Sequence, residues 1–350
     1  MPGLTRRTRY PKETVSTSAT TRAATPPLPM AVAPAEPAST AVSPARSTPS
    51  LFADYCALFK PRVSTMSIIT AAAGFYLGSL RSGISPFHLG MVEALAGIAI
   101  VTCGASALNQ ALERRTDALM RRTRNRPMAT GRIGLAHGLL LGFAAIFLGS
   151  LILAFVSNPL TGTLTLLTAI SYVAIYTPLK RITKINTFIG AFPGALPPLI
   201  GWTAARGVIE WPAVALFAII FVWQFPHFMA IGWMYRDDYA SAGIRLTATQ
   251  PTIQEAARQT VYQALFYAIL MIPVSIWPYF LGTTGPLYAV AATLLSLYYL
   301  WYTIRFVRIL RNPELSASRV IAQQLLRASV LYLPLLLAAM MLDAKGRLLF

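Results

Sequence analysis

The sequence is poor in charged residues and poorest in acidic ones. Only 12% of its 350 residues are charged, and 12 Asp and Glu residues stand against 30 Lys and Arg residues. A soluble globular domain is about 25% charged, so this composition, which is 55% hydrophobic, argues against a soluble enzyme. It also argues against a nucleic-acid-binding protein, because such proteins are basic without being this apolar. A basic charge on an apolar chain is typical of a membrane protein with basic cytoplasmic loops.

Groups that support several common chemistries are scarce as well. The two cysteines, Cys56 and Cys103, exclude a disulfide scaffold and a metal site built from cysteine. The three histidines include no closely spaced pair, and the sequence contains no phosphate-binding glycine loop. Because acidic residues are so few, their positions are informative.

Residues 1–50 differ from the rest of the chain. They are rich in Pro, Ala, Ser and Thr and contain almost no large apolar residues, so they cannot bury enough surface to offset the entropy lost on ordering. We therefore expect a disordered tail here and one transmembrane domain over residues 51–345. A basic, acid-poor N-terminus is also compatible with an organelle transit peptide. Its many prolines disfavour the amphipathic helix that import requires, so we favour a dispensable cytoplasmic tail.

Nine segments are apolar enough to cross a bilayer, which requires roughly 20 apolar residues per helix. The predicted fold class is therefore all-α, a polytopic membrane protein with nine transmembrane helices. The fifth segment contains Pro193, Pro197 and Pro198, which are tolerated where neighbouring helices satisfy the freed carbonyl groups. The segments lie at residues 64–81, 89–109, 134–156, 160–177, 186–205, 211–233, 261–282, 286–306 and 322–342.

The distribution of basic residues orients these segments. If the N-terminus and the loops after the second, fourth, sixth and eighth segments share one side, that side and its adjoining helix ends hold 26 of the 30 Lys and Arg residues. The other side holds only Arg81, Arg206, Lys345 and Arg347. Basic loops remain in the cytoplasm, so the N-terminus is predicted to be cytoplasmic and the C-terminus to lie outside.

Three side chains whose oxygen atoms can bind a metal are spaced four residues apart at the cytoplasmic end of the second segment. They are Asn109, Glu113 and Asp117 in the stretch ALNQALERRTDALM. On a helix each step of four residues rotates by only about 40°, so the three share one face. Two carboxylates and an amide oxygen suit Mg²⁺, which often bridges protein carboxylates to phosphates. The alternative is a solvated helix end in which Glu113 pairs with Arg114 or Arg121.

A basic cluster follows this acidic face. Arg121, Arg122, Arg124 and Arg126 precede Pro127, and the guanidinium group matches phosphate oxygens in a bidentate manner. A positive-inside loop that touches lipid headgroups would explain much of this charge. The acids and arginines nevertheless occur within eighteen residues, which favours a site where Mg²⁺ and arginine neutralise a leaving diphosphate.

Two more loops on the same side carry similar groups. The loop after the fourth segment, YTPLKRITKINT, contains Lys180, Arg181 and Lys184, and the segment after the sixth, MYRDDYASAGIR, contains Asp237 and Asp238. We interpret the three loops as one site at the cytoplasmic mouth of a helical bundle. Acids in the middle of the membrane would instead have indicated a proton or ion path, and the later segments carry none there.

His227, in the stretch WQFPHF, is the only histidine inside a segment near this side. A lone histidine within the membrane is more often a hydrogen-bonded structural residue than a ligand. Its neighbours Trp223, Phe225 and Phe228 are also suited to lining a flat apolar cavity, and imidazole can ligate iron. Both interpretations are open at this point.

These residues resemble a known family, the UbiA-type intramembrane prenyltransferases. The stretch NQALERRTDALMRRTRNRP resembles the first Asp-rich motif of that family. LFKPRVSTM, YTPLKRITKINTFIGAFPGALPPLIGW and WQFPHFMAIGWMYRDDYASAG agree with it as well, so the resemblance covers residues 52–342 in register. The PGALPPLIGW and WQFPHF stretches are similar to the branch of the family that transfers a farnesyl group to haem.

The resemblance implies nine helices around a central cavity open to the cytoplasm. It implies farnesyl diphosphate as the donor, Mg²⁺ as the cofactor, haem B as the acceptor and haem O as the product. By matching position, Asn109, Glu113 and Asp117 would form the first metal-binding and catalytic motif. Asp237 and Asp238 would provide a second acidic metal site, with Asp238 also counted among the catalytic residues.

The resemblance further implies that Arg122, Arg126, Lys180 and Arg181 hold the diphosphate and that His227 lies near the haem. It implies a multi-pass protein of the bacterial inner membrane, with the mitochondrial inner membrane as the alternative. The expected partners are the lipid bilayer and the two substrates, and haem A synthase or oxidase-assembly proteins are further candidates.

Two departures from the family pattern concern the acids. Glu113 stands where the family often has Asp, and its longer carboxylate can still reach a metal. The second motif of the family often has acids four residues apart, whereas here two adjacent acids lie between Tyr235 and Tyr239. The expectation of a second Mg²⁺ is correspondingly weaker. Both tyrosines and Tyr176 are candidates for stabilising a carbocation through their ring faces.

Three other functions compete with this interpretation. A secondary transporter would fit nine segments with a proline-broken fifth helix, but the polar residues gather on one side of the membrane and not at its midplane. A related prenyltransferase could use a quinone precursor or a chlorin as the acceptor. A scaffold for oxidase assembly would require no acidic triad, so that substitutions of the acids would have no effect.

Overall fold

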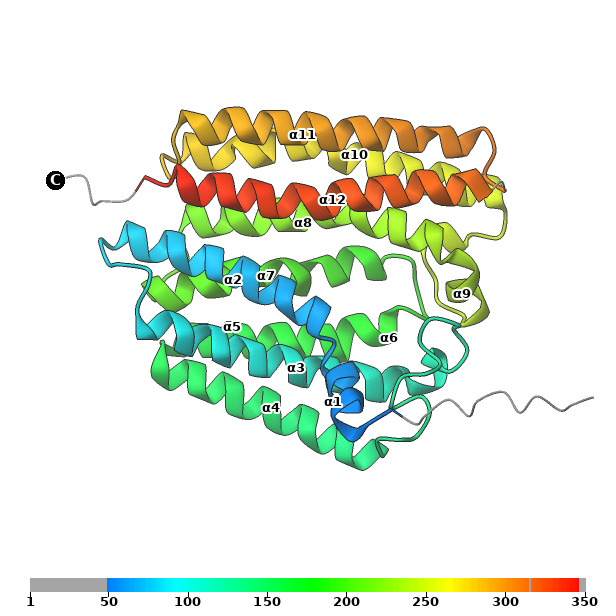
Figure 1. The fold of residues 1–350 in the computed structure, drawn as a ribbon, viewed down its shortest axis with the longest axis horizontal. Helices are drawn as coiled ribbons and strands as arrows, with labels where there is room; N and C mark the ends of the chain where they lie inside the picture. The colour runs from blue at the N-terminus through cyan, green and yellow to red at the C-terminus, as the bar shows by residue number, and fades with distance from the viewer. Residues whose placement is uncertain (1–48, 315, 346–350) are drawn as a thin grey trace, which may run out of the picture. The chain divides into compact units, whose positions relative to one another are not determined.

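The computed structural model describes residues 49–314 and 316–345, which form helices and connecting loops. The tail expected over residues 1–50 lies almost entirely outside this range. The helices, shown in Figure 1, are α1 (Leu51–Phe59), α2 (Pro61–Arg81), α3 (Leu89–Asp117), α4 (Leu135–Val156), α5 (Pro159–Ile170), α6 (Thr177–Leu179), α7 (Asn186–Arg206), α8 (Trp211–Met234), α9 (Arg236–Ser241), α10 (Ile253–Phe280), α11 (Pro286–Phe306) and α12 (Ser316–Leu342).

Eight helices in this range are long and apolar enough to cross a membrane, and α1 with α2 makes a ninth candidate that is bent by 50°. The all-α fold and the expected set of spans are therefore confirmed. The fourth span consists of α5, a π-helical turn (Ser171–Tyr176) and α6. Helix α7 continues through its three prolines, so the fifth span is not broken as the transporter alternative would require.

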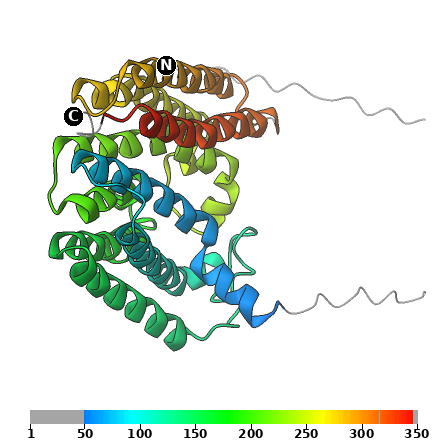
Figure 2. The same ribbon diagram turned by 60° about the vertical axis from the view of Figure 1, so that its left-hand side comes forward.

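Helix α7 packs closely against α2 near the last of its three prolines. A Cβ atom at Gly74 would collide with the Pro198 backbone, and one at Gly201 would collide with the Ala71 backbone. Glycine at both positions lets the two helix backbones approach, as small residues do in membrane bundles. This packing holds α2 and α7 together in the centre of the bundle, as Figures 1 and 2 show.

The remaining spanning helices pack on either side of this central pair. Helices α8, α10, α11 and α12 contact one another on one side, and α3, α4 and α5 do so on the other. Large apolar side chains on the outside of α4 are exposed, including Leu140, Phe143 and Phe147. They recur every three to four residues, so one face of α4 is available to lipid.

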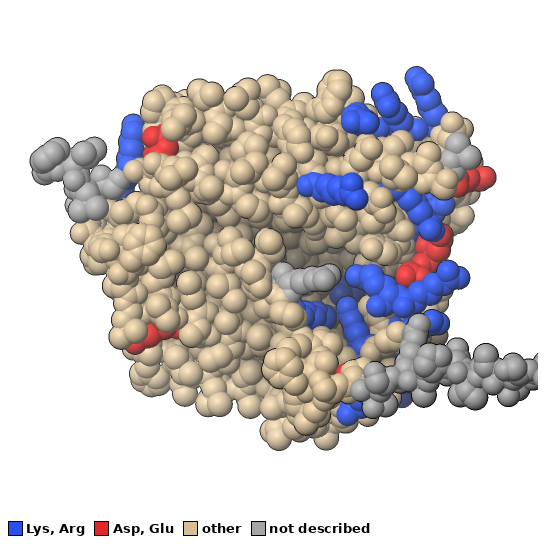
Figure 3. All heavy atoms as spheres, viewed as in Figure 1, with Lys and Arg blue, Asp and Glu red and all other residues tan. Residues whose placement is uncertain are grey.

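Charged side chains gather at one end of the helices. Figure 3 shows Lys and Arg concentrated at the end that carries α9, where this face is also hollowed. The loop between α3 and α4, the loop after α6 and helix α9 meet at this end. The expected association of three polar loops is therefore present in the fold.

Candidate active site

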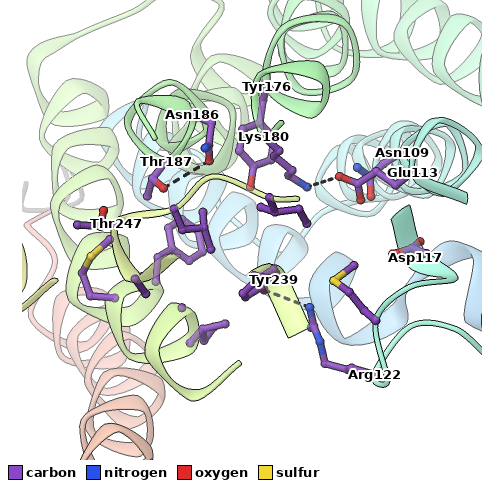
Figure 4. Close-up of a pocket in the computed structure, with 18 of the residues that line it drawn as sticks. Asn109, Glu113, Asp117, Arg122, Tyr176, Lys180, Asn186, Thr187, Tyr239 and Thr247 are labelled. Carbon is purple, nitrogen blue, oxygen red and sulfur yellow. Dashed lines mark hydrogen bonds and ion pairs between the residues drawn. The ribbon is translucent and has the colours of Figure 1, made fainter. Parts of the chain in front are cut away.

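A cavity of about 280 Å³ opens among these loops (Figure 4). Its polar wall comes from the C-terminal part of α3, the α3–α4 loop, the region around α6 and helix α9. The polar residues that line it include Lys60, Asn109, Glu113, Asp117, Arg122, Arg126, Tyr176, Lys180, Asn186, Thr187 and Tyr239. Six of the residues proposed for metal or diphosphate binding thus line one cavity, together with two of the three candidate tyrosines.

The three residues of the α3 face follow one another along this wall. Asn109 and Asp117 are each 1% exposed, and Glu113 lies between them one helical turn from either. All three lie on the same α-helix at i, i+4 and i+8, so their side chains project from one side of it. The shared helix face that the spacing predicts is therefore present in α3.

Two of the three are ion-paired inside the cavity. Arg126 Nη1 donates to both carboxylate oxygens of Asp117 at 2.9 and 2.8 Å. Lys180 Nζ donates to Glu113 Oε1 at 2.7 Å. The alternative pairing of Glu113 with Arg114 or Arg121 does not occur; its partner comes from another loop, 67 residues along the chain.

Asn109 has its own cationic partner, which the sequence argument did not single out. Lys60 lies between α1 and α2, and its Nζ donates to Asn109 Oδ1. The amide nitrogen of Asn109 donates to Thr177 Oγ1 at 3.1 Å, so the oxygen is turned towards Lys60. The backbone of Lys60 is left-handed, with φ of 48°, and this turn directs the chain from α1 into α2. Lys60 is therefore a fourth basic side chain in the cavity, beside Arg122, Arg126 and Lys180.

Arg122 contacts two aromatic rings, one directly before helix α9 and one within it. Its guanidinium carbon lies 5.1 Å from the Tyr235 ring centroid and 5.7 Å from that of Tyr239. Its Nη2 also donates to the Tyr239 hydroxyl at 3.1 Å. These cation–π contacts and the hydrogen bond connect the α3–α4 loop to α9 across the cavity.

A second cavity, of about 290 Å³, adjoins the first within the bundle. Helices α2, α3, α5, α7 and α8 surround it, and most of its wall is apolar or small. Tyr172, Tyr176 and Phe228 line both cavities. The two tyrosines lie in the π-helical turn, with ring centroids 5.6 Å apart. Polar and apolar compartments therefore share an aromatic wall.

The other proposed site residues lie elsewhere. Arg181 lines a separate pocket beside Lys180. Asp237 is exposed and pairs with Arg319 and Arg236. Asp238 is half-buried and is not among the residues that line the main cavity. The two adjacent acids of the second motif therefore lie apart from the α3 carboxylates in this arrangement.

His227 lies on the side of α8 that faces α12. Its Nδ1 is 2.8 Å from the Ser329 hydroxyl oxygen, and its ring stacks on Trp223 with centroids 4.9 Å apart. It does not line either cavity, but its neighbour Phe228, at a centroid distance of 5.7 Å, lines both. The imidazole therefore lies beside a residue of the wall that the two cavities share, without lining either cavity itself.

Several lining residues were missed because nothing local in the sequence marks them. Asn186 and Thr187 begin α7, and Tyr172 occupies the π-helical turn. Lys60 offered one signal, since a lysine directly before Pro61 at the basic end of the first span is a candidate for the same compartment. That signal depends on knowing which loops meet.

Comparison with known proteins adds a consistent result. The sequence model of the UbiA prenyltransferase family matches residues 67–330. A protein from Koribacter versatilis, named protoheme IX farnesyltransferase, is 45% identical over 294 residues, which are 84% of this chain and 94% of that protein. A protein of the same name from Myxococcus xanthus is 37% identical over 311 residues, covering 87% of this chain and 98% of that protein.

Solved structures agree in fold. A digeranylgeranylglyceryl phosphate synthase aligns with a TM-score of 0.66 at 16% identity, over 83% of this chain and 98% of that chain. A UbiA homologue from Archaeoglobus fulgidus, bound to DMAPP and Mg²⁺, aligns with a TM-score of 0.54 at 17% identity, over 82% of this chain and 99% of that chain. At this level of identity the likeness concerns the fold alone.

Proposed function

Because the chain belongs to the UbiA prenyltransferase family, we propose that it transfers the farnesyl group of farnesyl diphosphate to a vinyl group of haem B. Addition of water completes the reaction, and the products are haem O and diphosphate. One observation carries the proposal: acidic and basic side chains pair at the mouth of an apolar compartment. The relatives named protoheme IX farnesyltransferase support haem B as the acceptor.

The donor suits this pair of cavities. Lys60, Arg122, Arg126 and Lys180 bring four cationic side chains to the polar cavity, and they bind the diphosphate oxygens. The farnesyl chain enters the adjoining apolar cavity. We assign Arg181 a secondary role, because it lines the pocket on the other side of Lys180.

We propose that Mg²⁺ is held by Asn109, Glu113 and Asp117. Their oxygens are the ligands that Mg²⁺ prefers, and an ion that binds few protein groups keeps room for water and phosphate. An amide oxygen and two carboxylates form a hard donor set, which suits Mg²⁺ better than a transition metal that prefers sulfur or imidazole ligands. When bound, Mg²⁺ supplies positive charge to the leaving diphosphate.

The cations already in the cavity support this fit. Lys60, Arg126 and Lys180 each contact one member of the motif. Asn109, Glu113 and Asp117 would hold the metal through these same oxygens, and Lys60, Arg126 and Lys180 would then be available to bind the diphosphate. The same basic residues are therefore suited to balancing the charge of the acidic motif and that of the diphosphate.

The chain promotes bond breaking by stabilising the leaving group. As the allylic C–O bond of farnesyl diphosphate breaks, its electron pair remains on the diphosphate, where Arg122, Arg126 and Lys180 stabilise the charge. The vinyl electron pair of haem B forms the new C–C bond. Water then adds to the resulting cation and loses a proton, which gives the hydroxyl group of haem O. The rings of Tyr172 and Tyr176 stabilise the allylic cation, and the apolar wall excludes water until this stage.

For the second motif we propose a smaller role than for the first. Asp237 is exposed and ion-paired with Arg319, which argues against its use as a metal ligand. Asp238 is half-buried on the same short helix as Tyr239, which lines the cavity. We propose that Asp238 approaches the diphosphate site when substrate is bound and that a second Mg²⁺, if it binds, uses this residue.

On the acceptor side we propose that His227 contacts haem B and serves as an axial ligand. Its imidazole lies beside Trp223 and Phe228, which would add apolar surface beside a bound porphyrin. A ligand to iron would orient the macrocycle, so that a vinyl group faces the prenyl cation.

The protein is a multi-pass membrane protein. We propose that it lies in a bacterial inner membrane with its N-terminus and catalytic cavity on the cytoplasmic side. The positive-inside distribution of Lys and Arg supports the orientation, and the bacterial origin of the relatives supports the membrane. A haem A synthase or an oxidase-assembly protein would be a suitable recipient of haem O.

Release of diphosphate with alternative acceptors tests the proposal. Purified protein in detergent is incubated with farnesyl diphosphate and Mg²⁺, together with either haem B or 4-hydroxybenzoate. We expect diphosphate release above background with haem B and not with 4-hydroxybenzoate. EDTA should stop this release until Mg²⁺ is added in excess. Release with 4-hydroxybenzoate alone would favour a quinone-precursor acceptor, and release unaffected by EDTA would contradict the metal assignment.

The boundary between the two cavities provides a further prediction. A Cβ atom at Gly190 would collide with the Tyr176 ring, so Gly190→Ala should displace this ring into the path of the prenyl chain. We expect kcat/KM for farnesyl diphosphate to fall by about tenfold or more, as for one misplaced methylene in an apolar pocket, with a smaller fall for geranyl diphosphate.

Gly134→Ala is the matched control, because a Cβ at Gly134 meets nothing within 4 Å. Its kinetic constants should equal those of the wild type. Equal losses for geranyl and farnesyl diphosphate in Gly190→Ala would show that this boundary does not contact the prenyl chain.

A further inference from the structure

Ser329 of α12 contacts two aromatic side chains of α8. The Trp223 indole Nε1 donates to the Ser329 backbone carbonyl at 2.9 Å, and His227 Nδ1 lies 2.8 Å from the Ser329 hydroxyl oxygen. Trp223 and His227 are four residues apart and stack on each other at an interplanar angle of 28°. Ser329 is itself fully buried. The imidazole is therefore fixed by a stacked ring and by a hydrogen bond at one nitrogen.

The direction of that hydrogen bond follows from a second contact of the hydroxyl. Ser329 Oγ lies 2.6 Å from the carbonyl oxygen of Leu326, and two oxygens at this distance require a hydrogen between them. A serine hydroxyl has only one hydrogen, and Leu326 receives it. The Ser329 oxygen therefore has only lone pairs to offer His227. The hydrogen in the bond between Nδ1 and the Ser329 hydroxyl must then belong to Nδ1. The Ser329 hydroxyl accepts this bond.

The assignment of this hydrogen determines what the other nitrogen can do. A neutral imidazole with a hydrogen on Nδ1 has an unprotonated Nε2, which can act as a metal ligand. Nε2 has no hydrogen-bond partner among the described residues. It is also not fully buried, so a ligand can reach it. A hydrogen bond at the opposite nitrogen fixes the orientation of a ligating imidazole and raises its basicity.

We propose that Ser329 is a positioning residue for the acceptor: its hydroxyl holds His227 in the tautomer whose Nε2 binds the iron of haem B. Ser329 acts through His227 and does not itself touch the substrate. The inference rests on the proposed function, since it takes haem B as the acceptor. It assigns a role in substrate orientation to α12, a helix that contributes no residue to the polar cavity.

Haem binding without the prenyl donor tests this role. Ferrous haem B is titrated into the full-length protein in detergent, with the absorption spectrum reporting affinity and resonance Raman spectroscopy reporting the iron–histidine stretch. Ser329→Ala removes the hydroxyl but keeps the backbone carbonyl that holds Trp223. We expect haem B affinity to fall by about 10- to 100-fold. The iron–histidine band should move to lower frequency, because Nδ1 loses its acceptor.

Ser318→Ala is a matched control on the same helix. Ser318 Oγ also accepts from an aromatic N–H, Nε1 of Trp233 at 3.2 Å, and donates to a backbone carbonyl, that of Pro313 at 3.1 Å. This variant should retain the wild-type affinity and band position. An affinity loss equal to that of Ser329→Ala would show that the effect comes from helix packing and would overturn the proposal.

His227→Gln separates this inference from the proposed function. We expect this variant to lose the iron–histidine band. An unshifted band and unchanged affinity in Ser329→Ala, with the band lost in His227→Gln, would overturn the role of Ser329 and leave haem B as the substrate. A band that persists in His227→Gln would show that another residue ligates the iron, and a wild-type protein that does not bind haem B would contradict the proposed function itself.

Discussion

Replacing Asp117 with asparagine is expected to lower kcat for farnesyl transfer by about 100- to 1000-fold, the loss typical for removal of one group that stabilises developing charge. The Asp117 carboxylate is almost fully buried in the polar cavity and accepts two hydrogen bonds from Arg126. Asparagine has the same size but carries no negative charge, so it can neither bind Mg²⁺ as a carboxylate nor form the charged pair. Product formation in a single turnover, at saturating donor and Mg²⁺, measures the effect.

Asp54 offers a closely matched control for this substitution. It is 5% exposed, and its two carboxylate oxygens accept from Arg132 Nε at 3.0 and 2.9 Å, but it lies on α1 and does not line the cavity. Asp54→Asn should lower thermal stability to a similar extent and leave kcat near the wild-type value. Equal losses of kcat in the two variants would assign the effect of Asp117 to folding, and full activity in Asp117→Asn would refute the metal site.

Replacing Lys180 with methionine is expected to lower kcat by about 100-fold, because a cation that stabilises the leaving diphosphate is lost. Lys180 Nζ is 2.7 Å from Glu113 Oε1 and 4.5 Å from the centroid of the Tyr176 ring. It therefore lies where the acidic motif meets the aromatic wall. Methionine preserves most of the length of the side chain without its charge. Steady-state kinetics with varied farnesyl diphosphate separate the expected loss in kcat from a change in KM.

Lys184→Met serves as the control in the same loop. Lys184 is exposed, and its Nζ donates to Gln259 Oε1 at 3.0 Å outside the cavity. Its loss should leave both constants nearly unchanged, whereas Lys180→Arg should recover part of the activity by restoring the positive charge. If Lys180→Met changes KM alone, then Lys180 binds the ground state and does not stabilise the leaving group.

The parts of this site that could be predicted are those set by local periodicity. Asn109, Glu113 and Asp117 share a face because a helix repeats every 3.6 residues, and that argument requires no tertiary information. The spans and the gathering of basic loops at one end follow from apolar segment length and charge. These features depend on properties that each segment has independently of its neighbours.

The rest depends on contacts between distant segments. Lys60 reaches Asn109 across 49 residues, and Ser329 meets His227 across 102 residues; no periodicity in either segment indicates these pairs. The direction in which Asp237 projects depends on α9 and on its exposed partner Arg319. The close approach of α7 to α2 likewise joins segments far apart in the chain, which the prolines alone do not reveal.

The identity of haem B as the acceptor is best tested by the mass of the modified haem. Purified protein is incubated with haem B, farnesyl diphosphate and Mg²⁺, and the haems are extracted, separated and weighed by mass spectrometry. We expect a new haem that is heavier than haem B by one farnesyl group and one hydroxyl group, and that is absent with Asp117→Asn. Unmodified haem B from folded protein that still releases diphosphate would contradict this expectation and would require another acceptor.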